Sequence, residues 1–109
     1  MRQVNRKRRP EEWARAYGSV ERVQWMQRQP SVASGDGPCV NAHVSPPDGL
    51  PSGIGRKADY VWVVPLTEAE HTELHAVGEE TFQRRKGIDL AECAAEVHLR
   101  WIAYQGGAA

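Results

Sequence analysis

The sequence predicts an α+β domain in which a two-stranded hairpin leads into a helix, with helices before this unit and one long helix after it. Two valine-containing apolar segments, residues 39–44 and 59–66, are separated by a loop rich in proline and glycine, as two strands commonly are. Residues 10–28 and 67–105 instead carry helix caps and apolar residues at helical spacing. Both strands are therefore expected in the middle of the chain.

A single domain is expected over residues 10–105, between a basic arm at residues 1–9 and a frayed tail at residues 106–109. The arm carries five cations and no acid, although the whole chain has a formal net charge of +0. It either contacts the phosphates of a nucleic acid or serves as a solubilising tail. No apolar run is long enough to cross a bilayer and no signal-peptide core follows the arm, so we expect a soluble protein with no membrane partner.

Two short helices are expected before the first strand. Gly18 ends the first of them, and Ser19 is a favourable cap for the second, at about Val20–Arg28. The narrow apolar side of the second helix consists of Val20, Val23 and Met26 or Gln27, with Trp25 near its edge. Both helices are expected to cover the sheet.

The predicted hairpin joins Cys39–Val44 to Asp59–Leu66. Alternation along the second strand places Tyr60, Trp62 and Val64 on one face. The connecting loop, residues 45–57, is long for a hairpin and is either a flexible connector or a binding loop. Two cations at its end favour contact with phosphate, and they are Arg56 and Lys57.

Three helices are expected after the hairpin. The first opens with Thr67 and Glu70, a capping box that contributes on the order of 1 kcal/mol, and it ends at Gly78. A short helix at Glu79–Lys86 follows, with a basic last turn. The final long helix begins after Asp89, and its apolar stripe consists of Leu90, Ala94, Val97, Trp101 and Tyr104.

Three histidines are candidates for a joint chemical role. His71 and His75 are four residues apart on a predicted helix, so their imidazoles project from one face and can share one metal ion. His43 lies on the first predicted strand. The alternatives are a solvated surface pair on the helix and a histidine satisfied in the core or at a sheet edge.

Several short motifs follow one another along the chain: Ala42-His43, Gly55-Arg56-Lys57-Ala58-Asp59, Val63-Val64-Pro65-Leu66, Glu70-His71, Glu73-Leu74-His75 and Gly78-Glu79-Glu80-Thr81-Phe82. Their order resembles that of HNH nucleases, and more narrowly that of small phage and prophage HNH proteins related to recombination-enhancement nucleases. The resemblance runs from about Trp13 to Trp101. It implies a ββα-metal (HNH) core, a two-stranded hairpin plus helix, flanked by the N-terminal helices and the long C-terminal helix.

The resemblance also implies roles for individual residues. His43 is expected to be the general base that deprotonates the attacking water, a role that suits imidazole near neutral pH. His71 and His75 are expected to hold one divalent ion, with Mg, Mn, Ni and Zn not distinguished. Asn41 and Asp59 are candidate auxiliary residues. The cations expected to contact DNA are Arg6, Lys7, Arg8, Arg9, Arg56, Lys57, Arg84, Arg85 and Lys86.

The chain departs from the family pattern at four positions where a structural zinc would be held. These positions carry Ser31, Ser34, Thr67 and Glu70. None of these side chains is a thiolate or an imidazole, so no structural zinc is expected. Two further departures affect the catalytic set, because Ala42 stands where a metal ligand is frequent and Trp62 stands near the middle asparagine of the family name.

The sequence therefore predicts a metal-dependent endonuclease that hydrolyses DNA phosphodiester bonds in the cytoplasm of a bacterium or a phage-infected host cell. The alternative is a catalytically degenerate HNH scaffold that binds DNA or protein in phage recombination or packaging. The expected partners are DNA and either a recombinase or a phage packaging protein.

Overall fold

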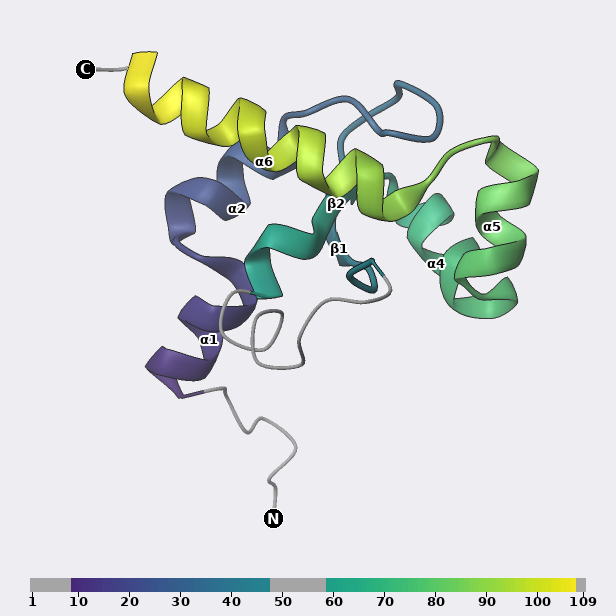
Figure 1. The fold of residues 1–109 in the computed structure, drawn as a ribbon, viewed down its shortest axis with the longest axis horizontal. Coiled ribbons are helices and arrows are strands. Elements are labelled where there is room, and N and C mark those ends of the chain that lie inside the picture. The colour runs from purple at the N-terminus through teal and green to yellow at the C-terminus, as the bar shows by residue number, and fades with distance from the viewer. Residues whose placement is uncertain (1–8, 48–58, 108–109) are drawn as a thin grey trace.

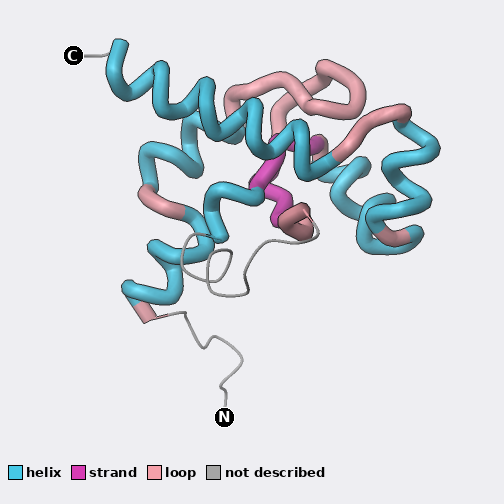
Figure 2. The backbone as a smooth tube through the Cα atoms, viewed as in Figure 1, coloured by secondary structure: helices cyan, strands magenta, loops and turns pink. Residues whose placement is uncertain are grey.

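The computed structural model describes residues 9–47 and 59–107, and its elements are those of an α+β protein (Figure 1). In chain order they are α1 (Pro10–Tyr17), α2 (Val20–Gln27), β1 (Val40–His43), a short 3-10 helix (Asp59–Trp62), β2 (Val63–Leu66), α4 (Glu68–Val77), α5 (Glu79–Lys86) and α6 (Leu90–Gly107). The two strands lie at the centre, with helices around them (Figure 2). The predicted α+β class is confirmed. No helix within these two ranges is long and apolar enough to span a bilayer.

The hairpin is shorter than the sequence predicts. β1 and β2 pair antiparallel, and the pairing ends with His43 opposite Val63. Asp59–Trp62 coils into a 3-10 helix that packs against α1 and α6 instead of extending the second strand. Packing against these helices overrides the β propensity of the aromatic and β-branched residues in this segment. The predicted strand alternation through Tyr60 and Trp62 is therefore wrong.

Strand β2 is buried on both faces, because helices cover each side of the hairpin. All four of its residues are buried. Val64 and Leu66 belong to a core cluster with side chains of α4, α5 and the first turns of α6. Val63 belongs to a second cluster with α2 and the middle of α6. A strand covered on both sides has a continuous apolar sequence, which is what Val63–Leu66 shows.

The side of α2 that faces the core differs in part from the side expected from the positions of its valines. Val20 is 57% exposed, whereas Arg22, Trp25 and Met26 are buried. The ring centroids of Trp25 and Trp101 are 5.4 Å apart, so the large indole packs against α6 and sets the rotation of α2. The expected apolar side is therefore confirmed at Met26 and at Trp25 near its edge, and it is wrong at Val20.

Most predicted helix ends are confirmed. Thr67 Oγ1 accepts a hydrogen bond from the Glu70 amide at 3.2 Å, and a Glu70 carboxylate oxygen accepts one from the Thr67 amide at 2.9 Å. α4 then ends at Gly78, which adopts a φ of +86°. α6 runs to Gly107, beyond the predicted end near residue 105. Its buried stripe consists of Leu90, Ala94, Val97 and Trp101, while Tyr104 is 51% exposed.

Candidate functional site

Two imidazoles of α4 converge on each other. His71 and His75 lie on successive turns of one helix face, and their Nε2 atoms are 3.0 Å apart. The rings meet edge to face, with centroids 4.5 Å apart. This separation suits a hydrogen bond between two neutral rings, and it also suits two adjacent ligands with bonds of about 2.1 Å to one ion. The helix therefore aims two ring nitrogens at one point.

The pKa of His71 is lowered from its ordinary value. Burial is the largest cause, and the charges of His75 and then His43 add to it. A lowered pKa keeps the imidazole neutral at physiological pH, and the neutral ring is the form that binds a metal. The contribution from His43 means that this residue, on the neighbouring strand, lies within electrostatic reach of His71.

Helix α1 orients His43. The side chain of His43 is exposed at the end of β1, and its Nε2 atom is 2.7 Å from the backbone carbonyl oxygen of Ala16. Because a carbonyl oxygen only accepts, Nε2 carries the proton and donates, and Nδ1 keeps a lone pair. The ring also meets Tyr17 edge to face, with centroids 5.0 Å apart. This contact could not be predicted from the sequence, because any residue at position 16 supplies a backbone carbonyl.

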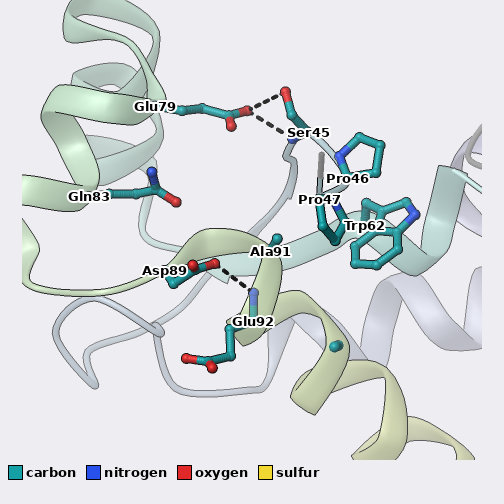
Figure 3. Close-up of a pocket in the computed structure, with 10 residues that line it drawn as sticks. Ser45, Pro46, Pro47, Trp62, Glu79, Gln83, Asp89, Ala91 and Glu92 are labelled. Atoms are coloured by element: carbon teal, nitrogen blue, oxygen red, sulfur yellow. Dashed lines mark hydrogen bonds between the residues drawn. The ribbon is translucent and has the colours of Figure 1, made fainter. Parts of the chain in front are cut away.

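An open cavity of about 450 Å³ lies beside His43, and Asp59 and Glu79 share its wall. Ser45, Trp62 and Glu79 also line an adjoining cavity of about 490 Å³ toward α5 and α6 (Figure 3). Glu79 accepts hydrogen bonds from the Ser45 amide at 2.9 Å and from its hydroxyl at 3.2 Å, which ties α5 to the end of β1. His43 is therefore one of the residues that line an open hollow at the end of β1.

The two predicted metal ligands, His71 and His75, are brought together, and no third metal-binding side chain joins them in the described ranges. The Nε2 atoms of His71 and His75 fit one divalent ion by their separation. Within residues 9–47 and 59–107, no group of three His, Cys, Asp or Glu side chains is arranged to hold a metal. Ala42, immediately before His43, has no donor atom to add. Any ion at this pair would take its remaining ligands from water and substrate.

The two candidate auxiliary residues differ in what they can do. The side-chain amide of Asn41 donates to the Val23 carbonyl of α2 at 3.2 Å, so its amino group is committed to packing. Asp59 instead lines the cavity beside His43. Asp59 is therefore the candidate with access to a ligand there.

The four positions assigned by resemblance to a structural zinc meet in space, and we name them the Glu70 cluster: Ser31, Ser34, Thr67 and Glu70. The Ser31 hydroxyl donates to Glu70 at 2.6 Å, and Ser31 is only 5% exposed. Burial raises the pKa of Glu70, but hydrogen bonds from Ser31, Ser34 and Thr67 together bring it below its ordinary value. The cluster joins the turn before β1 to the first turn of α4 through hydrogen bonds.

The cations of α5 are partnered by acids of the same surface. Arg85 and Lys86 lie 3.1 Å and 3.0 Å from the carboxylate oxygens of Glu73. Arg84 lies 3.7 Å from an exposed glutamate one turn earlier. Hydrogen bonds from Lys86 and Arg85 lower the pKa of Glu73. The charges of these cations are thus partly neutralised by neighbouring acids.

The other cations expected to contact DNA are at the chain start and in the long loop. Arg9 is exposed just before α1. The rest lie outside the described residues, and they are Arg6, Lys7, Arg8, Arg56 and Lys57.

The side chain of Arg22, on α2, is buried against α6. The sequence did not predict a buried arginine there. Arg22 is 1% exposed, its Nη2 atom is 3.3 Å from Nδ1 of His98, and its guanidinium carbon is 5.3 Å from the centroid of the Tyr60 ring. Burial lowers the pKa of Arg22 to about 10. Burial and then the charge of Arg22 lower the pKa of His98, so His98 is a neutral partner of the arginine. Gly18 makes room for this side chain, because a Cβ there would be 3.1 Å from Cδ of Arg22.

Searches of family models, of curated proteins and of solved structures found no match to this chain.

Proposed function

We propose that this chain is a metal-dependent endonuclease of the HNH kind, which hydrolyses phosphodiester bonds of DNA. One arrangement carries the proposal. At the end of β1, the ring of His43 is held by the Ala16 carbonyl, and on α4 the Nε2 atoms of His71 and His75 lie 3.0 Å apart. A fixed base within electrostatic reach of one of two metal-binding imidazoles, in the order strand, strand, helix, suits metal-assisted hydrolysis.

His43 is the general base in this proposal. Its Nδ1 takes a proton from water as the water oxygen attacks the phosphorus atom, while the P–O bond to the leaving oxygen breaks and that oxygen takes a proton from solvent. The Nε2–H group keeps pointing at the Ala16 carbonyl, 2.7 Å away, whose dipole stabilises the imidazolium that forms. Asp59 lies on the wall of the same cavity, where its carboxylate can orient the attacking water.

His71 and His75 are the metal-binding residues. A bound divalent ion supplies charge stabilisation at the phosphate and at the leaving oxygen. Neutral imidazoles suit Mn, Ni and Zn at least as well as Mg. With two protein ligands, affinity for the free ion is expected to be weak and to rise when a phosphate adds its oxygens.

A nicking assay on supercoiled plasmid tests the proposal. Mg, Mn, Ni and Zn are each added in a separate reaction, and a reaction with EDTA is the metal-free control. The wild type is expected to nick only with metal. His43→Gln keeps a donor for the Ala16 carbonyl but has no basic nitrogen, so nicking is lost while DNA affinity is kept. His98 lies outside the proposed site, and His98→Asn keeps an acceptor for Arg22. This variant should therefore nick DNA as the wild type does. Nicking that survives His43→Gln would overturn the assignment of the base.

The second candidate is a non-catalytic HNH scaffold that binds DNA, or a protein such as a recombinase or a phage packaging protein. Its support is the absence of a third metal-binding side chain in the described part of the chain, together with Ala42 beside His43. A scaffold of this kind binds DNA without metal and nicks with none of the four ions. Its affinity should fall steeply with salt, and less steeply once residues 1–9 are deleted.

A further inference from the structure

Helix α6 has a second apolar face, directed away from the core. Leu99 is 66% exposed and Ile102 is 50% exposed. The other residues of this face are small and also exposed, and we name the whole set the outer α6 face: Ala95, Leu99, Ile102, Ala103 and Gly106. Each of them lies three or four positions from another member of the set, as residues on one side of a helix do. A helix that is apolar on two opposite sides is normally covered on both.

The shape of this region leaves the outer α6 face accessible. α6 crosses the top of the molecule, and its C-terminal end extends beyond the other helices (Figure 1). Beside Leu99 lies a mainly apolar hollow of about 400 Å³, lined also by Pro30, Val32 and Cys93. The exposed Leu99 therefore lies next to a hollow on the same surface. A partner surface with the same two features can place its own leucine in this hollow and receive Leu99 in its own.

Charge indicates which partner fits. Glu96 and Arg100 are exposed, flank Leu99 and also line the hollow. Neither side chain makes an ion pair with another residue in the described ranges. If two α6 helices pack antiparallel about a two-fold axis near residue 98, Glu96 of each copy faces Arg100 of the other. A parallel pair would oppose like charges instead.

We infer that the outer α6 face is the interface of a homodimer, in which α6 of a second copy packs antiparallel against it. The small residues allow the two helices to approach closely, and each Leu99 lies against the hollow of the other copy. Two equal ion pairs between Glu96 and Arg100 fix the antiparallel direction. The contact is a single helix pair, so the expected dissociation constant is on the order of micromolar. The inference does not rest on the nuclease proposal.

Sedimentation velocity of the full chain without DNA tests this inference, over a range from about 1 µM to several hundred µM chosen around the expected constant. The 12.2 kDa chain should pass from monomer to dimer as its concentration rises. Leu99→Glu should raise the dissociation constant at least about tenfold, because two carboxylates would meet in the interface. Val20→Glu is the matched control, since Val20 is a similarly exposed valine on α2 and its substitution should change nothing.

The charge pair gives a second, independent test with the fold left intact. Glu96→Arg and Arg100→Glu should each weaken the dimer, because each creates like charges across the axis. The double exchange Glu96→Arg with Arg100→Glu should restore it. A chain that stays monomeric throughout, a dimer indifferent to Leu99→Glu, or a double exchange that restores nothing would each overturn the inference. Association only with a different protein would do the same.

Discussion

The hydroxyl of Ser31 and the carboxylate of Glu70 are joined by a hydrogen bond of 2.6 Å, across 39 positions of the chain. The same carboxylate accepts a hydrogen bond from the Thr67 amide at 2.9 Å. It therefore caps the start of α4 and also bonds to a distant segment of the chain. A buried hydrogen bond to a charged group contributes more than one between neutral groups. Glu70 therefore fastens α4, which carries the histidine pair, to the turn before β1.

Glu70→Ala is expected to lower the free energy of unfolding by roughly 1–3 kcal/mol, because the cap and the buried tie are lost together. The pKa of Glu70 is below its ordinary value of 4.5, so this stability is present above about pH 4.5 and is lost as the pH falls below it. Urea unfolding at pH 7 and pH 3.5 should thus show a large difference from wild type only at the higher pH. Glu68→Ala, on the exposed side of the same turn, is the control, and an equal loss there would contradict the role of Glu70.

The Glu70 cluster should accept zinc once its donors are exchanged. The four side chains already meet, so Ser31→Cys, Ser34→Cys, Thr67→Cys and Glu70→His together supply three thiolates and an imidazole. We expect one bound zinc per chain by metal analysis, and a rise in melting temperature that EDTA reverses. The wild type treated in parallel gives the baseline. A quadruple variant that folds and retains no zinc would count against the resemblance at these positions.

Excess metal should separate the metal-binding pair from the base. If α4 holds the ion as proposed, His71→Ala or His75→Ala removes one of its two protein ligands. The metal concentration for half-maximal nicking should then rise at least about 100-fold, since even outer-shell changes cost 10–100-fold. Saturating metal should return part of the activity. No metal concentration should rescue His43→Gln, because that variant lacks the proton acceptor. Equal metal requirements for all variants would show that α4 does not hold the ion.

His98 should make the protein less stable in mild acid. Its pKa is lowered by burial and by Arg22, so the unfolded chain binds more protons as the pH falls through about 6.5. The free energy of unfolding should therefore fall between pH 7.5 and pH 5.5, by at most about 1.4 kcal/mol per pH unit from this group. His98→Asn keeps an acceptor for Arg22 and does not titrate, so its profile should be flatter. His71 adds a slope of the same sign in both proteins, and identical profiles would refute the role of His98.

The helices after the hairpin could be predicted because their ends carry local chemistry. Thr67 and Glu70 cap one helix, and Gly78 and Gly87 end two of them with positive φ, which glycine adopts without strain. The spacing of His71 and His75 likewise fixes their meeting wherever a helix forms. Such features depend on residues within one or two turns of each other, so the sequence alone reveals them.

Features that depend on distant segments could not be predicted. Asp59–Trp62 coils because α1 and α6 pack against it, although its composition favours a strand. Arg22 is buried because Gly18, Tyr60 and His98 make a place for it. Each of these outcomes is decided by neighbours that only the folded chain supplies.

The group that orients His43 is a peptide carbonyl, so no side-chain replacement at Ala16 can delete it. Only displacement of α1 as a whole would free the imidazole to rotate about its bonds. A fragment reduced to the hairpin and α4 would keep His43, His71 and His75, but it would lack the carbonyl that fixes the orientation of the His43 ring. The smallest fragment that keeps the orientation of His43 therefore begins with α1, which supplies the Ala16 carbonyl oxygen.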